Sequence, residues 1–235
     1  RDFAVQYSQR SRGADVLTID YRVAPKHPFP CALEDAVTAY QWLMKEKNYR
    51  ASDIVVAGDS AGGGLALALV MYLRDHALPL PAGVLVMSPW ADLTCSGESH
   101  ETNFHRDPQF GGTTDNMLHN SSYIGDADPH APYLSPMFGD FTDFPPTLIQ
   151  VGSEEVLLSD SLTVARKLRE AHRKLRISVY DGMFHVFQMA LRLIPESREA
   201  WAEAGRFLEI VYGVERTEEG RKVRLVRSNR KRKKR

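Results

Sequence analysis

The chain has 235 residues, carries 30 Lys or Arg against 30 Asp or Glu, and is 43% hydrophobic. This length permits one large α/β domain or two small ones, and no apolar run approaches the roughly 20 residues of a membrane helix. The charge is uneven, because residues 221–235 hold ten Lys or Arg and no acid. We therefore expect an acidic globular domain over residues 1–213 and a basic, disordered tail over residues 214–235.

Both ends of the chain and its two cysteines bear on location and partners. The first four residues lack the basic segment and apolar core of a signal peptide. Cys31 and Cys95 form no metal-binding or redox spacing and suit a reducing compartment. We expect a cytoplasmic protein that holds no metal. The last six residues, all Lys or Arg, could bind nucleic acid or serve as a nuclear address, but a solvated tail is the favoured interpretation.

Apolar runs alternate with helical patterns along the first part of the chain. Residues 15–20 predict a short buried strand, and three prolines in the next ten residues predict an irregular loop. An amphipathic helix follows, with Leu33, Ala36, Val37, Tyr40 and Leu43 on one face. The runs at 54–57 and 83–88 predict further buried strands, with a helix between them. This alternation favours a mostly parallel sheet covered by helices on both faces.

The second part of the chain contains one long segment of different composition. Residues 91–143 are rich in Asp, His, Asn, Gly and Thr, with one weak helix expected at 114–123. A long insertion of this kind predicts a lid or cap over a site, although a plain surface loop is the alternative. Strands are expected at 147–151 and 176–180, and helices at 159–172 and 196–211.

The stretch from Gly58 to Gly63 carries the main chemical signal. Gly58, Ser60 and Gly62 have the Gly-x-Ser-x-Gly spacing of a nucleophile elbow between a strand and a helix. We expect a Cβ atom at either of these two glycines to collide with the neighbouring strand or helix. The amide of Ala61, at the helix start, would point at a developing oxyanion. An ordinary Gly-rich turn with an incidental serine is the alternative.

A serine nucleophile needs a base and an acid that orients the base. In α/β hydrolases the three follow in the order Ser, acid, His, each after a strand. His185 follows the last expected strand, and Glu154, Glu155 and Asp160 follow the one before. His27, inside the proline-rich loop, is expected to be structural. Asp160 also fits an acid in the first turn of a helix.

Several motifs together resemble the hormone-sensitive-lipase family of bacterial-type carboxylesterases, the third α/β-hydrolase fold group. They are YRVAPKHPFP (21–30), EDA (34–36), GDSAGG (58–63), SPWADL (88–93), PP (145–146) and GMFHVF (182–187). The resemblance implies the α/β-hydrolase fold, with Ser60 as nucleophile, Glu155 as acid and His185 as base. It also implies short-chain acyl or aryl esters as substrates and no cofactor. We add Asp59, Trp90 and Val186 as candidates for the substrate lining, and allow for a homodimer.

The chain departs from the family pattern in three ways. Lys26 stands where the family has Glu, and Val186 stands where it has Gly, which could crowd the acyl side of the site. The His-Gly-Gly-Gly loop, which gives amides to the oxyanion hole, does not occur in the sequence. We therefore expect an N-terminally truncated domain in which the first strands and the cap are partly missing. The alternatives to a serine esterase are a non-catalytic small-molecule-binding protein of the same fold, or an inactive fragment.

Overall fold

The computed structural model describes residues 2–215 and 224–225. Four strands form its main sheet: β1 (Val55–Asp59), β2 (Gly83–Met87), β3 (Thr147–Gly152) and β4 (Leu175–Tyr180). The α-helices are α1 (Asp2–Arg10), α2 (Cys31–Lys45), α3 (Ala61–Asp75), α4 (Ser99–Thr102), α5 (Leu158–Glu170) and α6 (Pro195–Val211). Three short 3-10 helices lie at Ala51–Asp53, Pro136–Phe138 and Phe187–Ala190.

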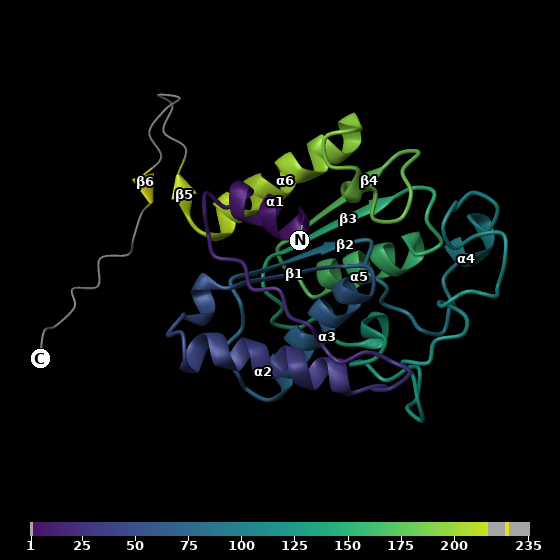
Figure 1. Cartoon of the computed structure of the whole chain (residues 1–235), viewed down its shortest axis with the longest axis horizontal. Coiled ribbons are helices and arrows are strands. Elements are labelled where there is room, and N and C mark those ends of the chain that lie inside the picture. Colours follow the sequence, from purple (N-terminus) through teal and green to yellow (C-terminus); the bar gives the residue numbers. More distant parts are fainter. Residues whose placement is uncertain (1, 216–223, 226–235) are drawn as a thin grey trace, which may run out of the picture.

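The sheet is parallel throughout, with the strands in the order β1-β2-β3-β4 (Figure 1). Every residue of β2 and β3 is buried, whereas β1 and β4 are only partly buried. Central strands of a parallel sheet are covered on both faces, which explains why β2 and β3 are continuous apolar runs in the sequence. The predicted α/β class and parallel sheet are therefore confirmed.

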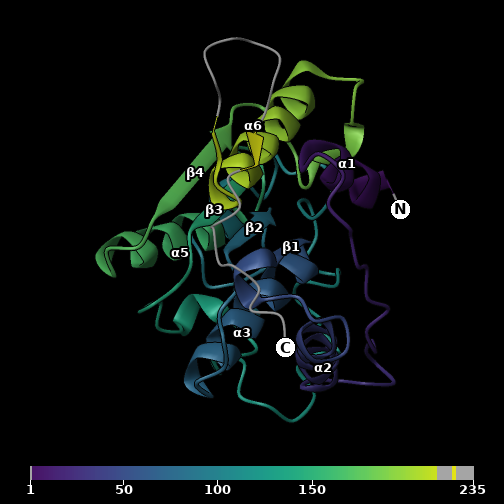
Figure 2. The same ribbon diagram turned by 90° about the vertical axis from the view of Figure 1, so that its left-hand side faces the viewer.

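Helices cover both faces of this sheet. In Figure 2, α1 and α6 lie on one face, and α2, α3 and α5 lie on the other. Successive residues of β2 explain this two-sided core, because Leu85 packs with Trp201 of α6 while Val84 and Val86 pack with side chains of α3 and α5. Helix α1, which the sequence patterns did not predict, packs Phe3 against Trp201 with ring centroids 5.0 Å apart.

One charged side chain, Glu203, joins α6 to the sheet. It is 3% exposed and accepts hydrogen bonds from four side chains of β3 and β4. The donors are Gln150 Nε2, Arg176 Nε, Ser178 Oγ and Tyr180 Oη. Burial would raise the pKa of Glu203, but these hydrogen bonds outweigh burial and leave the pKa lowered. The buried carboxylate is thus fully satisfied, as a helix–sheet contact of this kind requires.

The prediction of a buried strand at residues 15–20 is wrong. This segment is extended but forms no strand, and Val16 and Leu17 are 38% and 46% exposed. Residues 14–19 and β1 both line one cavity of about 1040 Å³. Among the described residues β1 pairs only with β2, so the segment lacks the hydrogen-bonded neighbour that a strand needs.

The helix expected at 114–123 is also absent from this described segment, which forms turns instead. The Asn116 side chain supplies the reason. Its Oδ1 accepts from the amides of Leu118 and His119, and its Nδ2 donates to the carbonyls of Phe110 and Thr113. Asparagine bonds of this kind compete with helical hydrogen bonds. The α-helix of the 91–143 segment, α4, lies earlier, and a 3-10 helix lies later, at Pro136–Phe138.

Little of the expected basic tail is described. Strands β5 (Val214–Glu215) and β6 (Arg224–Leu225) pair antiparallel, and the rest of residues 214–235 lies outside the described residues. None of the helices in the described part of the chain has both the length and the hydropathy that a membrane crossing needs.

Candidate active site

Ser60 is the single residue between β1 and α3. Its backbone lies at φ 54° and ψ −124°, a strained conformation for a serine. Hydrogen bonds from the β2 side hold it there: the Ser60 amide donates to Met87 O at 2.9 Å, and the Ser60 carbonyl accepts from Trp90 N at 2.9 Å. This is the sharp strand-to-helix turn that the Gly-x-Ser-x-Gly spacing predicts.

The glycines of the turn do not all act as expected. A Cβ atom on Gly58 would lie 2.1 Å from the carbonyl oxygen of Gly62, so the predicted collision is correct there. The same prediction is wrong for Gly62, whose added Cβ would find its nearest atom, Tyr21 Oη, at 4.0 Å. Gly64 makes the close contact instead, because a Cβ there would lie 2.1 Å from Trp90 O. Close packing of α3 against the segment that follows β2 therefore depends on Gly64.

Ser60, His185 and Glu155 are joined by two hydrogen bonds. His185 Nε2 lies 2.9 Å from Ser60 Oγ, and His185 Nδ1 lies 2.9 Å from Glu155 Oε2. His185 is 2% exposed and Glu155 is fully buried. A carboxylate can only accept at Nδ1, so Nδ1 carries the proton and the lone pair of Nε2 faces the serine hydroxyl. The arrangement can take a proton from Ser60.

Glu155 is held in place by a second set of donors. Its Oε1 accepts from the Gly152 amide at 2.6 Å and from Ser88 Oγ at 2.7 Å. Ser88 is fully buried and also accepts a hydrogen bond from the Val186 amide, at 3.1 Å. One hydroxyl thus connects the acid with the loop that carries the base. The sequence analysis did not single out Ser88, although it stands directly after a strand, as Ser60 does.

Residues of the 91–143 segment also support the acid and the base. Asn103 Nδ2 donates to the carbonyls of Ser153 and Glu155, at 2.9 and 2.8 Å. Asp107 Oδ2 accepts from the amide that follows Glu155, at 2.9 Å. The ring of Phe110 meets that of His185 edge-on, with centroids 5.0 Å apart. These three residues were also missed, because only the folded segment brings them to the site.

The two other candidate acids face elsewhere. Glu154 forms an ion pair with Arg106, its oxygen and the guanidinium nitrogen 2.5 Å apart. Asp160 lies in the first turn of α5, fully buried, and its Oδ2 accepts from the amides of Ala91 and Asp92, both at 2.9 Å. Burial raises the pKa of Asp160 well above its usual value. Neither of these carboxylates is hydrogen-bonded to His185.

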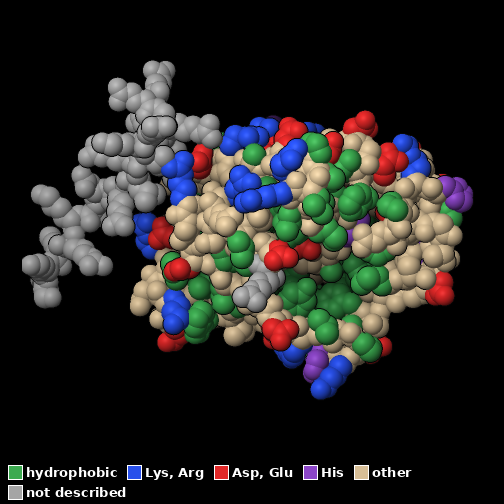
Figure 3. All heavy atoms as spheres, turned by 45° about the horizontal axis from the view of Figure 1, so that its top comes forward, with side chains coloured by type: hydrophobic (Ala, Val, Ile, Leu, Met, Phe, Trp, Pro, Cys, Tyr) green, Lys and Arg blue, Asp and Glu red, His purple; other side chains and the backbone are tan. Residues whose placement is uncertain are grey.

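Two cavities are lined by the residues next to Ser60 in the chain. The larger, of about 1040 Å³, is lined by Asp59 and Val186 among others, and the smaller, of about 240 Å³, by Ala61 and Trp90. Figure 3 shows a hollow lined mainly by hydrophobic side chains on the face turned toward the viewer. Ala61 begins α3, so its amide has no acceptor within the helix.

Val186, directly after the base, stands where the family pattern has glycine. Its φ is 49°, in the left-handed region that a β-branched residue rarely adopts, and it is 3% exposed. A glycine would adopt this backbone without strain. The valine side chain fills space beside the base that a glycine would leave open.

Known proteins resemble this chain along most of its length. The family profile of the α/β-hydrolase fold matches residues 2–189. An acetyl-hydrolase of Streptomyces hygroscopicus is 43% identical over 201 residues, which cover 86% of this chain and 67% of the relative. An esterase of Acinetobacter venetianus is 36% identical over 192 residues, which cover 82% of this chain and 63% of the relative. The chain thus spans about two thirds of the length of these relatives.

Solved structures agree with the sequence matches. An esterase/lipase from an uncultured bacterium superimposes with a TM-score of 0.84 at 37% identity, over 91% of this chain and 71% of that one. A hormone-sensitive lipase from a metagenome library superimposes with a TM-score of 0.82 at 36% identity, over 88% of this chain and 68% of that one. This chain belongs to the hormone-sensitive-lipase-like family of the α/β-hydrolase fold.

Proposed function

We propose that this chain is the catalytic domain of a serine carboxylesterase that cleaves short-chain esters. The observation that carries the proposal is the continuous line of hydrogen bonds from Ser60 Oγ through His185 to Glu155. The names of the relatives support it, since they include an acetyl-hydrolase and an esterase.

The reaction runs through an acyl-enzyme. Ser60 Oγ attacks the ester carbonyl while His185 Nε2 takes its proton, and Glu155 stabilises the imidazolium that forms. The Ala61 amide donates to the oxyanion of the tetrahedral intermediate. His185 then protonates the leaving alcohol. A water molecule, activated by His185 in turn, hydrolyses the acyl-enzyme and frees Ser60.

The size of the smaller cavity supports a short acyl group. Its volume is about 240 Å³, and its walls are mostly apolar, with Trp90, Leu93, Met117 and Tyr123 among them. Met117 and Tyr123 come from the 91–143 segment, which supports our proposal that this segment acts as a lid-like insertion within a catalytic domain of residues 1–213. We propose that Asp59 and Val186, which line the larger cavity, also line the substrate site.

A second candidate function is non-catalytic binding of a small molecule. The absence of a His-Gly-Gly-Gly motif from the sequence favours it, because each missing oxyanion donor typically costs about 10²–10³ in rate. An inactive fragment would share this feature. Retention of serine, acid and base in one hydrogen-bonded line favours the esterase.

The test compares the purified chain with Ser60→Ala, and uses Ser52→Ala, an exposed serine outside the site, as the matched control. We expect hydrolysis of p-nitrophenyl butyrate and covalent labelling by a fluorophosphonate in the wild type and in Ser52→Ala, and neither in Ser60→Ala. Labelling that persists in Ser60→Ala would refute the nucleophile. A folded wild type that binds the ester without hydrolysing it would favour the binding function.

The cellular location and the binding partners are separate proposals. The two free cysteines suit a cytoplasmic location, which cell fractionation measures. Light scattering tests the homodimer that we allow for. We expect no binding to polynucleotides, and binding that weakens as salt rises would contradict this.

A further inference from the structure

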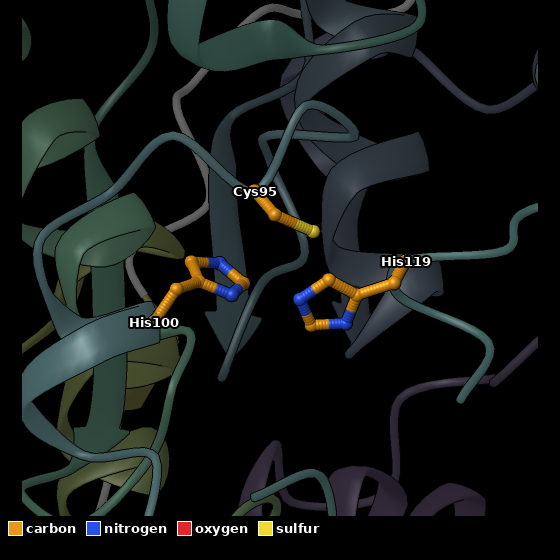
Figure 4. Close-up of side chains that lie close together, drawn as sticks. All are labelled: Cys95, His100 and His119. Carbon is orange, nitrogen blue, oxygen red and sulfur yellow. The ribbon is translucent and has the colours of Figure 1, made fainter. Parts of the chain in front are cut away.

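Three side chains of the 91–143 segment converge at a place that the proposed esterase reaction does not use. Cys95, His100 and His119 each bring one potential ligand atom to within 4.8 Å of the other two. Figure 4 shows the thiol and the two imidazoles turned toward a common space. The turns of the segment bring them together, so the irregular spacing of these residues in the sequence gave no sign of a cluster.

The buried His100 side chain has hydrogen-bonding atoms without partners. It is 7% exposed, and neither of its ring nitrogens has a hydrogen-bond partner. Its Nε2 lies 3.9 Å from Asp160 Oδ1, a fully buried oxygen that also lacks a partner. Buried polar atoms are rarely left unpaired. An imidazole bound to a metal through one nitrogen usually turns its other N–H toward a carboxylate, which would satisfy both groups at once.

His119 is already oriented as a ligand. Its Nδ1 lies 3.1 Å from Asn116 Oδ1, and an amide oxygen can only accept, so Nδ1 carries the proton. The lone pair therefore sits on Nε2, the other ring nitrogen. Cys95 is half-buried, and its thiol donates a weak hydrogen bond to Leu118 O at 3.4 Å. The thiol would release this proton to solvent on binding a cation as the thiolate.

We propose that Cys95, His100 and His119 bind a Zn²⁺ ion, with water as the fourth ligand. One thiolate and two imidazoles suit a borderline-soft cation of tetrahedral geometry. Zn–S and Zn–N bonds of about 2.3 and 2.0 Å put the ligand atoms roughly 3.3–3.6 Å apart, so the cluster has to contract by about 1 Å. The exposed side chain of His119 has the freedom to rotate inward.

The ion would link three parts of the 91–143 segment, which supports the acid Glu155. Cys95 follows β2, His100 lies on α4, and His119 comes after the turns that contain Asn103 and Asp107. Both of these residues hold the backbone around Glu155. We therefore expect the ion to stabilise the fold without taking part in ester hydrolysis. The test of the metal site and the test of the esterase activity are therefore independent of each other.

The experiment measures the metal bound to the purified chain after loading with Zn²⁺ and dialysis, and separately measures thermal unfolding at a set concentration of free Zn²⁺. The variants are Cys95→Ser and His119→Ala; the matched controls are Cys31→Ser and His130→Ala, which lie outside the cluster. We expect one ion per chain and a rise in Tm of roughly 5–10 °C when free Zn²⁺ is about 100 times its Kd. Both cluster variants should bind tenfold more weakly or worse, and both controls should bind as the wild type does.

Cobalt gives a second measurement that does not depend on stability. Co²⁺ bound in the same site should give a thiolate-to-metal charge-transfer band, which Cys95→Ser abolishes and Cys31→Ser retains. A wild type that keeps well under one ion per chain would overturn the proposal. So would equal binding in wild type, Cys95→Ser and His119→Ala.

Discussion

Ser88→Ala tests how the acid and the base are held together. The Ser88 hydroxyl donates to Glu155 Oε1 at 2.7 Å and accepts from the Val186 amide at 3.1 Å. Its removal leaves a buried amide without an acceptor, at about 1–3 kcal/mol, and breaks a hydrogen bond to a charged group, at about 1.5–3 kcal/mol. The two costs overlap, so we expect the free energy of unfolding to fall by about 2–4 kcal/mol.

The same change should slow catalysis without weakening substrate binding. Glu155 still accepts hydrogen bonds from Gly152 N and from His185 Nδ1, so the acid stays beside the base but is held less firmly. A misplacement of about 1 Å costs on the order of 10² in rate. We expect kcat to fall about 10- to 100-fold and KM to stay nearly constant, because Ser88 lines neither cavity beside Ser60.

Urea unfolding and steady-state hydrolysis of p-nitrophenyl butyrate measure the two effects, the second at a temperature where the variant stays folded. Ser161→Ala is the matched control, since Ser161 is equally buried but its hydroxyl has no hydrogen-bond partner. We expect that control to stay within about 0.5 kcal/mol of the wild type. The reasoning fails if Ser88→Ala matches Ser161→Ala in stability and the wild type in kcat.

Further variants test the acid, the helix–sheet contact and the elbow. Glu155→Gln should lower kcat by about 10³–10⁴ and Glu154→Gln by only a few-fold; the reverse order in steady-state assays would refute the choice of acid. The stability that Glu203 contributes is present above its unfolded pKa near 4.5 and is lost as pH falls through its lowered folded pKa. Urea unfolding should therefore find Glu203→Gln destabilised by about 1–3 kcal/mol at neutral pH. A difference in the free energy of unfolding between wild type and variant that does not change with pH would contradict this. Thermal unfolding should find Gly58→Ala destabilised by about 3 kcal/mol or more and Gly62→Ala within about 1 kcal/mol of the wild type; equal losses would show that the 2.1 and 4.0 Å clearances do not govern the turn.

The order of motifs along the chain was enough to predict Ser60 and His185 as partners. In a parallel sheet, residues that directly follow strands gather at one edge, so position after a strand carries spatial information. Position after a strand did not separate Glu154 from Glu155; the family resemblance implied Glu155, and that carboxylate is the one beside His185 Nδ1. Adjacent residues of a turn point in different directions, and the donors Ser88 Oγ and Gly152 N hold the Glu155 carboxylate inward while Glu154 pairs with Arg106.

Predictions failed where the outcome depended on distant packing. The apolar pattern at 15–20 is typical of a strand, but a strand also needs a pairing partner, and among the described residues β1 pairs only with β2. The pattern at 114–123 permitted a helix, but Asn116 takes the amides that a helix would use. The collision expected at Gly62 depended on how α3 approaches the sheet, which the pentapeptide alone does not specify.

The strand order explains why the base depends on a residue from the middle of the sheet. Ser60 follows β1 at one edge and His185 follows β4 at the other, so three strand spacings, about 14 Å, separate the strands that carry them. The loop after β4 must therefore cross the ends of β3 and β2 to bring the imidazole to the serine. On the way it meets Glu155 after β3 and Ser88 after β2, and bonds to both. The position of a loop that extends so far from its own strand depends on hydrogen bonds to residues at the ends of the strands it crosses. This is why we expect Ser88→Ala to lower kcat, although Ser88 lines neither of the two cavities.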